Sequence, residues 1–205
     1  MNMMRFTTMK TKLRKYPSIF LILLLVISSC FLTGCVNQHP KDSKKSSQGE
    51  SVETMLEITD PKEKQAVLNA KAKVKALSGN PRIVATSPAV ADICDKLDLD
   101  LVGVPKSSVS KIPSRYKKVK KVGLAMSPDM EIVSSLNPDW ILAPSSLETE
   151  LKPKLEELKN TEYAFLNLRS VQGMYRSVQE LGEIFGKQQE AEKMTKEFTT
   201  FYKSY

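Results

Sequence analysis

The segment VGLAMSPDMEIVSSLNPDWILAP, residues 122–144, contains one complete helix-and-strand unit of the predicted fold. Ser127 followed by Pro128 is typical of a helix start, because serine caps the first turn and proline has no N–H to lose there. Apolar side chains at positions 130, 133 and 136 predict one buried helix face. The run DWILAP then predicts a buried strand, so this segment returns the chain from a helix to a sheet.

The same alternation continues on both sides of this segment. Further apolar runs predict strands at Arg82–Thr86, Leu101–Val104 and Tyr163–Leu168. One helix is predicted to begin at Ser87, and another at Ser145 or Ser146 with an interruption near Pro153, while residues 106–123 are predicted to form a basic loop. Strands that alternate with helices in this way predict an α/β fold, a parallel sheet flanked by helices.

A single amphipathic helix is predicted from Val171 to the last residue, with no capping glycine to end it. Its final turns carry Phe198, Phe201, Tyr202 and Tyr205. We expect such a helix to pack against more protein than this chain provides. Left uncovered, its apolar face would lower the stability of the chain or favour self-association.

The N-terminus is predicted to be a lipoprotein export signal. Five of the charges behind the net charge of +8 lie in residues 1–15, so the rest of the chain is too weakly basic to indicate a nucleic-acid surface. The apolar run Ile19–Ile27 is shorter than the ~20 residues that span a bilayer. It leads to LTGC, which matches the bacterial lipobox and predicts signal residues 1–34 and lipidation of Cys35; Cys30 fits less well.

Residues 35–80 are predicted to be a lipidated, mostly disordered tether, and residues 81–205 a globular lobe. The start of the tether is rich in Lys, Ser and Gln. The segment Lys62–Leu77 has good helix formers but a thin apolar stripe, so it reads as either a solvated helix or more tether.

The lobe lacks the residues that common catalytic sites need. His39, the only histidine, lies in the tether, which excludes histidine-based zinc sites, Ser-His-Asp triads and Cys-His dyads from the lobe. No glycine-rich phosphate loop is present. Cys94 lies on an apolar helix face and is predicted to be a buried structural thiol. The sequence therefore does not predict an enzyme.

Together these features resemble the N-terminal lobe of class III substrate-binding proteins of ABC importers, which take up haem, siderophores and cobalamin. The resemblance covers residues 81–205 and rests on RIVATSP, LVGVP, Gly123, the Pro-Asp-Met-Glu of residues 128–131 and the Leu-Asn-Pro-Asp of residues 136–139. Aspartate stands at 129 where the family usually has asparagine. Haem-binding lipoproteins of this family are the most similar, through DKLDLDLVGVPKS, IPSRYKKV and MYRSVQELGEIFGKQQEA.

In those haem-binding proteins a methionine two residues before the proline is an axial ligand of the haem iron, so the resemblance implies that role for Met126. A thioether is a soft neutral ligand that favours low-spin iron. Leu124 and Ala125 would then form part of an apolar cleft wall. By position alone, Met126 is better explained as a residue that fills a gap at the sheet edge than as an iron ligand. Met130, in the first helical turn, is predicted to belong to the core.

The resemblance also implies partners for the haem propionates. The helix start offers Ser87, Ala89 and Val90 as anion-binding groups, although Pro88 has no N–H to contribute. Ser108, with Lys106 and Lys111 nearby, is a second candidate region. Simple helix capping and solvation are the alternatives for these residues.

The resemblance implies an ABC permease and its ATPase as partners, with cell-wall haem-transfer proteins as donors. Glu131 matches a glutamate with which family members dock on the permease. The protein would work on the extracellular face of a Gram-positive-like cell membrane, held by its lipid. A histidine of the C-terminal lobe is the second axial ligand in the relatives, and we expect this chain to contain only the first half of that site.

Three readings of function stay open at this level. The first is a lipid-anchored haem receptor of an ABC importer. The second is a siderophore or cobalamin carrier of the same family. The third is a lipoprotein that transports nothing, an interaction partner or an inert remnant.

Overall fold

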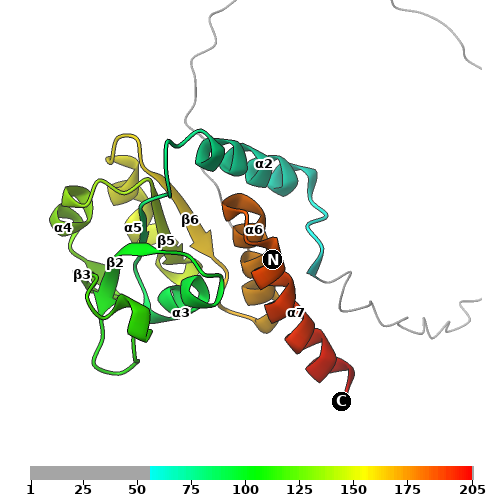
Figure 1. Ribbon diagram of the computed structural model, residues 1–205. Helices are drawn as coiled ribbons and strands as arrows, with labels where there is room; N and C mark the ends of the chain where they lie inside the picture. Colours follow the sequence, from blue (N-terminus) through cyan, green and yellow to red (C-terminus); the bar gives the residue numbers. More distant parts are fainter. Residues whose placement is uncertain (1–55, 205) are drawn as a thin grey trace, which may run out of the picture. The chain divides into compact units, whose positions relative to one another are not determined.

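The computed structural model describes residues 56–204, which form a six-stranded sheet with helices on both faces (Figure 1). The strand order is β4-β3-β2-β1-β5-β6, and every neighbouring pair is parallel except the β3–β4 hairpin. The strands are β1 Ile83–Ala85, β2 Leu101–Lys106, β3 Lys120–Leu124, β4 Ser127–Pro128, β5 Trp140–Pro144 and β6 Glu162–Leu166. The helices are α2 Pro61–Lys75, α3 Pro88–Lys96, α4 Met130–Ser135, α5 Glu148–Glu156, α6 Val171–Phe185 and α7 Gln188–Lys203, with short 3-10 turns η1 Ser114–Tyr116 and η2 Ser145–Leu147. The predicted α/β fold is confirmed.

Two hydrophobic clusters hold the layers together, one on each face of the sheet. In β1, Ile83 and Ala85 join the cluster under α2, α3, α6 and α7, while Val84 joins the cluster under α4 and α5. Strand β5 divides in the same way, with Trp140 on one face and Ile141 on the other. Successive side chains of a strand point to opposite faces, so a sheet covered on both sides needs continuous apolar strands. This explains why the central strands could be read from short apolar runs.

Two local predictions around residue 127 were wrong. Ser127 and Pro128 do not begin a helix but pair antiparallel with Leu124 and Gly123 as β4. The cap of α4 is Asp129, whose carboxylate accepts hydrogen bonds from the N–H groups of Glu131 and Ile132, both at 3.1 Å. One aspartate satisfies two of the four unpaired N–H groups of the first turn, so the helix begins there.

The predicted loop between β2 and β4 contains a strand, β3, that the sequence did not reveal. Only Val122 of its five residues is buried, whereas its first residue Lys120 and its last residue Leu124 are exposed. The segment is held as a strand by its pairing with β2, in which Gly103 lies opposite Lys120, and it has no apolar run that would have predicted it.

Helix α5 also differs from the prediction. Ser145 and Ser146 lie in η2, and α5 continues through Pro153 without the expected interruption. Leu151 and Leu155 flank the proline and are both buried in the core, so packing holds the helix together there.

The long terminal helix is two helices. Gly186 ends α6 with a left-handed backbone, φ 70°, and α7 begins at Gln188. The N–H of Lys187 donates to the carbonyl of Gly182 at 2.7 Å, which closes the last turn of α6. Part of the expected apolar surface is covered, because Tyr175 stacks on Phe198, but Phe201 remains 62% exposed.

Helix α2 belongs to the folded lobe, although the predicted boundary placed it in the tether. Its buried residues Val67 and Ala70 join the core beside α6. Lys71 forms an ion pair with Glu183 of α6. The lobe therefore begins before residue 81.

Burial of Cys94 makes the thiol unreactive. Its side chain is 0% exposed, and burial raises the pKa of Cys94 to about 12. Because the thiolate is the reacting form, we expect a soluble chain of residues 36–205, in which Cys94 is the sole thiol, to resist a thiol reagent while folded. One equivalent of thiol should react after denaturation. Rapid labelling of the native chain would show that α3 is not packed as described.

Several predictions lie outside the described residues. These are the export signal of residues 1–34, the lipidation of Cys35, and the tether up to residue 55. No helix within residues 56–204 has both the length and the apolar character to cross a membrane.

Candidate ligand-binding edge

The candidate site lies at the edge of the sheet where the parallel strands have their carboxyl ends. From β1 the chain moves outward to β2 and β3, and then returns to β5 on the other side of β1 before it reaches β6. The loops after β1 and β5 therefore leave in opposite directions. Ligands of open parallel sheets bind outside the carboxyl ends of the strands at such a reversal. We call this side of the lobe, formed by the loops after β1, β2, β3, β5 and β6, the carboxyl edge.

Met126 lies at the carboxyl edge in a two-residue turn. Leu124 pairs with Ser127 across the β3–β4 hairpin, which leaves Ala125 and Met126 to connect the strands. The Met126 side chain is 67% exposed and that of Leu124 is 62% exposed. A methionine that filled a gap in the core would be buried, so this exposure favours a contact with something outside the lobe.

Gly123 fixes the direction of this hairpin. Its φ of 96° is a conformation that L-residues rarely adopt, and a Cβ at this position would lie 2.7 Å from the backbone nitrogen of Asp129. The same nitrogen donates to the carbonyl of Val122 at 2.8 Å. The backbone at residues 122 and 123 therefore lies directly against that of Asp129, at the base of the turn that carries Met126.

Ser87, Ala89 and Val90 follow β1 as predicted. The Ser87 hydroxyl accepts a hydrogen bond from the N–H of Val90 at 3.2 Å and caps α3, so that N–H already has a partner. Ala89 is exposed, and within the described part of the chain its N–H makes no hydrogen bond. Of the three groups, the Ala89 N–H is the one available to an incoming anion.

Ser108, Lys106 and Lys111 follow β2, the strand between β1 and β3. All three are exposed. Ser107, rather than Ser108, orders this loop, because its hydroxyl accepts from the N–H of Ser110 at 2.9 Å. Since neighbouring strands are about 5 Å apart, the loops that carry Ser87, Ser108 and Met126 lie side by side along one edge.

Val109, Val171, Arg169 and Ser145 also lie at the carboxyl edge, although the sequence did not reveal them as site residues. In the described part of the chain, four of the six most exposed large apolar side chains lie there: Val109, Leu124, Met126 and Val171. Val109, Leu124 and Met126 lie at the ends of the neighbouring strands β2 and β3 and form an apolar patch of the kind that marks a binding surface, whereas Val171 follows the more distant β6. Two polar residues accompany it, the exposed Arg169 after β6 and Ser145 after β5, whose hydroxyl is buried without a partner among the described residues. All of these except Leu124, the last residue of β3, lie within five residues after a strand, which is the signal that could have found them.

Glu131 and the Leu136–Asp139 motif belong to α4 and to the turn that follows it. Glu131 is exposed in the first turn of α4. The Asp139 carboxylate accepts from the N–H of Arg82 at 2.8 Å, and the Arg82 guanidinium donates to the carbonyl of Leu136 at 2.7 Å. These bonds join the beginnings of β1 and β5, so this motif has a structural role at the opposite edge of the sheet.

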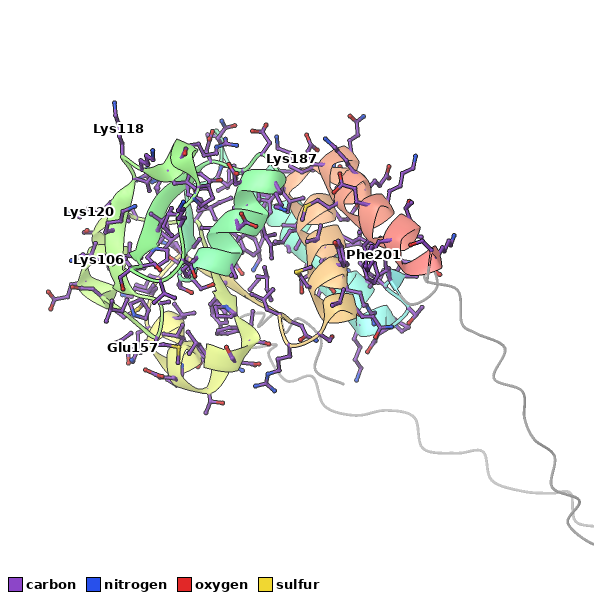
Figure 2. All side chains as sticks on the ribbon, turned by 90° about the horizontal axis from the view of Figure 1, so that it is seen from below. Lys106, Lys118, Lys120, Glu157, Lys187 and Phe201 are labelled. Carbon is purple, nitrogen blue, oxygen red and sulfur yellow. The ribbon has the colours of Figure 1, made fainter. Side chains whose placement is uncertain are left out.

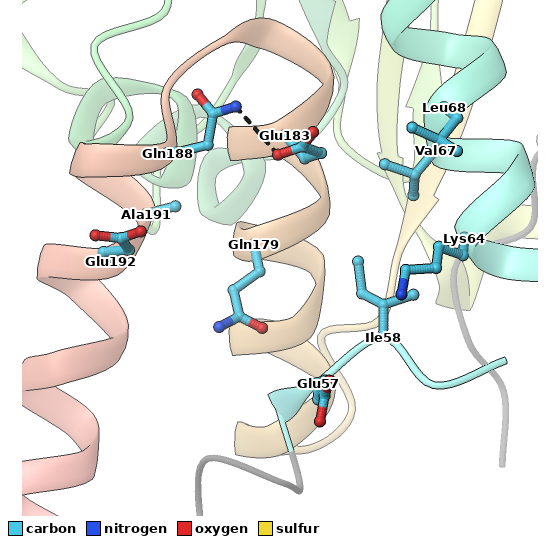
Figure 3. Close-up of a pocket in the computed structure, with 10 residues that line it drawn as sticks. All are labelled: Glu57, Ile58, Lys64, Val67, Leu68, Gln179, Glu183, Gln188, Ala191 and Glu192. Carbon is cyan, nitrogen blue, oxygen red and sulfur yellow. Dashed lines mark hydrogen bonds between the residues drawn. The ribbon is translucent and has the colours of Figure 1, made fainter. Parts of the chain in front are cut away.

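A separate depression of about 610 Å³ lies between α2, α6 and α7 (Figure 3). Val67, Leu68 and Ala191 supply its apolar part, and the Gln188 amide donates to Glu183 at 3.1 Å on its rim. None of its lining residues belongs to the carboxyl edge. We therefore place the candidate ligand site at the carboxyl edge and not in this depression.

Comparison with known proteins agrees with the fold. The family model described as "Periplasmic binding protein" matches residues 83–204. High-affinity heme uptake system protein IsdE of Staphylococcus aureus (strain Newman) is 37% identical over 117 residues, which cover 57% of this chain and 39% of the relative.

Solved structures give the same result. An ABC transporter substrate-binding protein from Listeria monocytogenes EGD-e is 43% identical with a TM-score of 0.57, and S. aureus IsdE complexed with heme is 34% identical with a TM-score of 0.56; both matches cover 60% of this chain and 46% of the other. The siderophore binding protein BauB, bound to acinetobactin and ferric iron, is 25% identical with a TM-score of 0.51, over 59% of this chain and 45% of the other.

The chain thus spans less than half the length of the relatives that it matches. The family model nevertheless covers more than half of this chain, including all six strands of the sheet. On this evidence the chain belongs to the periplasmic binding protein family.

Proposed function

We propose that this chain is the N-terminal ligand-binding lobe of a haem carrier, which passes haem unchanged to an ABC permease for iron acquisition. The observation that carries the proposal is the exposed side chain of Met126 in the two-residue turn at the carboxyl edge. The similarity to IsdE supports haem as the ligand.

The carboxyl edge has the chemistry that a haem requires. Val109 and Leu124 offer apolar contacts to the macrocycle on either side of Met126. The Met126 sulfur would bind iron from one axial direction. The Ala89 N–H and the Arg169 guanidinium, after β1 and β6, are candidate partners for the propionates, and Ser87 and Ser108 lie beside them.

The rest of the transport system follows from this role. Lipidation of Cys35 would hold the carrier on the extracellular face of the membrane, near its permease. Glu131 would help to dock the lobe through a rim charge, which affects orientation and association rate more than affinity.

A haem titration of soluble residues 36–205, followed by absorbance, tests the proposal. We expect saturable binding by the parent chain with a low-spin spectrum. Met126→Ala should lower the affinity at least tenfold and remove the low-spin features, because the soft axial ligand is lost.

Two leucine variants separate ligation from packing. Met126→Leu keeps the apolar volume but removes the sulfur, so it should bind haem with an altered spectrum. Met130→Leu, at a half-buried residue packed against the core, should behave like the parent. If the Met126→Leu spectrum equals that of the parent, Met126 is not an iron ligand, and absence of binding by the parent would exclude haem carriage by this chain.

A siderophore carrier is the second candidate, because the lobe also resembles BauB. Saturable binding of a ferric siderophore, unchanged by Met126→Leu and without haem binding, would favour it. A chain that stays folded and binds neither ligand would instead be a non-transporting lipoprotein.

A further inference from the structure

Positive charge is concentrated in one short segment of the lobe. Residues 106–121 contain seven Lys or Arg and no Asp or Glu. The other residues of 56–205 contain sixteen Lys or Arg and twenty Asp or Glu. Charge is therefore unevenly distributed along the chain, with one cationic segment in an otherwise anionic lobe.

Most of these cations have no acidic partner. Arg115 is neutralised, since its guanidinium donates to Asp98 at 2.8 Å and to Asp100 at 2.7 Å. The six lysines form no ion pair within the described residues: Lys106, Lys111, Lys117, Lys118, Lys120 and Lys121. We call these six the lysine surface. Because no acidic side chain neutralises these lysines, their charges add to a positive surface potential.

The lysine surface lies along β2 and β3. Lys120 and Lys121 pair with Gly103 and Val104 at one end of these strands, and Lys106 pairs with Leu124 at the other. Figure 2 shows Lys106, Lys118 and Lys120 on the same side of the lobe.

An aliphatic side chain lies among these cations. Val109, between Lys106 and Lys111 in the chain, is 95% exposed. Because Val109 contacts the haem in the proposed function, the charges of the lysines, and not an inserted apolar side chain, would bind the membrane.

We propose that the lysine surface binds an anionic phospholipid surface and turns the β3 side of the lobe toward the membrane. The lysines are spread over loops and strand ends, so their charge matches a flat array of phosphates better than one small anion. The proposal rests on the proposed function in one respect, because the lipid at Cys35 would keep the lobe near a membrane.

Vesicle co-sedimentation of soluble residues 36–205, which lack the lipid and the signal, tests this inference. We expect binding to vesicles of equimolar phosphatidylcholine and phosphatidylglycerol, no binding to phosphatidylcholine alone, and release at high salt. The triple variant Lys117→Gln, Lys118→Gln, Lys120→Gln should lose at least tenfold in partition coefficient.

A matched control keeps the test specific. The variant Lys159→Gln, Lys193→Gln, Lys196→Gln removes the same charge from exposed lysines without ion pairs elsewhere in the described lobe, and it should bind like the parent. An equal loss in both variants would overturn the proposal, because net charge alone would then explain the binding. The proposal would also be overturned if soluble polyphosphate bound the chain as well as the vesicles do at the same phosphate concentration.

Failure of this proposal and failure of haem binding are distinguishable. The lysine triple variant should keep the haem titration of the parent, since Lys117, Lys118 and Lys120 lie at the beginning of β3 and Met126 lies beyond its other end. Met126→Leu should keep the vesicle binding of the parent.

Discussion

Glu180→Gln is expected to make the lobe more stable at alkaline pH and to remove part of its pH dependence. Glu180 is 1% exposed on α6, next to Glu63 of α2. Burial first, and then the hydrogen bond with Glu63 and the charge of that residue, raise the pKa of Glu180 far above its ordinary value. Arg176, the facing cation, donates to Glu63 at 3.2 Å and opposes this shift.

The hydrogen-bond pattern agrees with a protonated Glu180. Neither of its oxygens, nor Oε1 of Glu63, receives a hydrogen bond from a donor in the described residues. A proton on Glu180 would supply the missing donor between the two carboxyl groups. In that state the pair would join α2 to α6 through one shared proton.

The sign of the effect follows from proton binding. Above the ordinary glutamate pKa the unfolded chain releases this proton and the folded lobe retains it, so the folded state becomes relatively less stable as pH rises. Up to the raised pKa, this group alone costs at most about 1.4 kcal/mol for each pH unit. Glutamine keeps the size and can donate to Glu63, so the variant should lack this slope.

Urea unfolding between mildly acidic and alkaline pH measures the difference between parent and variant. That difference should grow with pH in favour of Glu180→Gln. Glu183→Gln is the matched control, because hydrogen bonds from Lys71 and Gln188 lower the pKa of Glu183 and its contribution is lost only as pH falls. A difference between parent and Glu180→Gln that does not vary with pH would mean that Glu180 is ionised in the folded lobe.

The central layers of the fold could be predicted from the sequence because their signals are local. Strands β1, β5 and β6 are short apolar runs with both faces buried, and α3 has a serine cap followed by a proline. Such features depend on neighbours in the chain, and the predicted bounds of these elements differ from the observed ones by one or two residues.

Elements at the margins were missed because long-range contacts define them. Strand β3 is a lysine-rich segment that owes its order to β2, and α2 has only a thin buried stripe against α6. Gly186 was overlooked because apolar positions continue on both sides of it. The carboxylate of Glu180 reads as a solvated side chain, and only the packing of α2 reveals that it is buried.

The candidate site could be predicted in part. The resemblance identified Met126 and Leu124, and the structure added their exposure together with Val109 and Arg169 at the same edge of the sheet. Val109, Met126 and Arg169 belong to loops after separate strands, so no spacing in the sequence relates them. Only the order of strands in the sheet brings them to one edge.

Gly123→Ala is expected to destabilise the lobe and to weaken haem binding together. The new Cβ would meet three backbone atoms: Asp129 N at 2.7 Å, Ser127 O at 3.1 Å and Pro128 C at 3.3 Å. Backbone cannot rotate away as a flexible side chain would, and alanine also disfavours the positive φ. The combined cost is roughly 2–4 kcal/mol, which corresponds to a fall in Tm of about 5–15 °C.

Gly79→Ala is the control for this substitution. No heavy atom lies within 4 Å of a Cβ at residue 79, and its φ is not positive, so the Tm should change little.

The hairpin couples this strain to the ligand site. If Gly123→Ala relieves the contact with Asp129 by opening the turn, Met126 moves with it, because only Leu124 and Ala125 separate the two residues. A folded Gly123→Ala variant, compared with the parent well below its Tm, should therefore bind haem more weakly, while Gly79→Ala binds normally. If Gly123→Ala lowers the Tm but leaves the haem spectrum and affinity unchanged, the turn does not position the iron ligand. In that case the apolar side chains of the neighbouring loops would have to hold the haem without it.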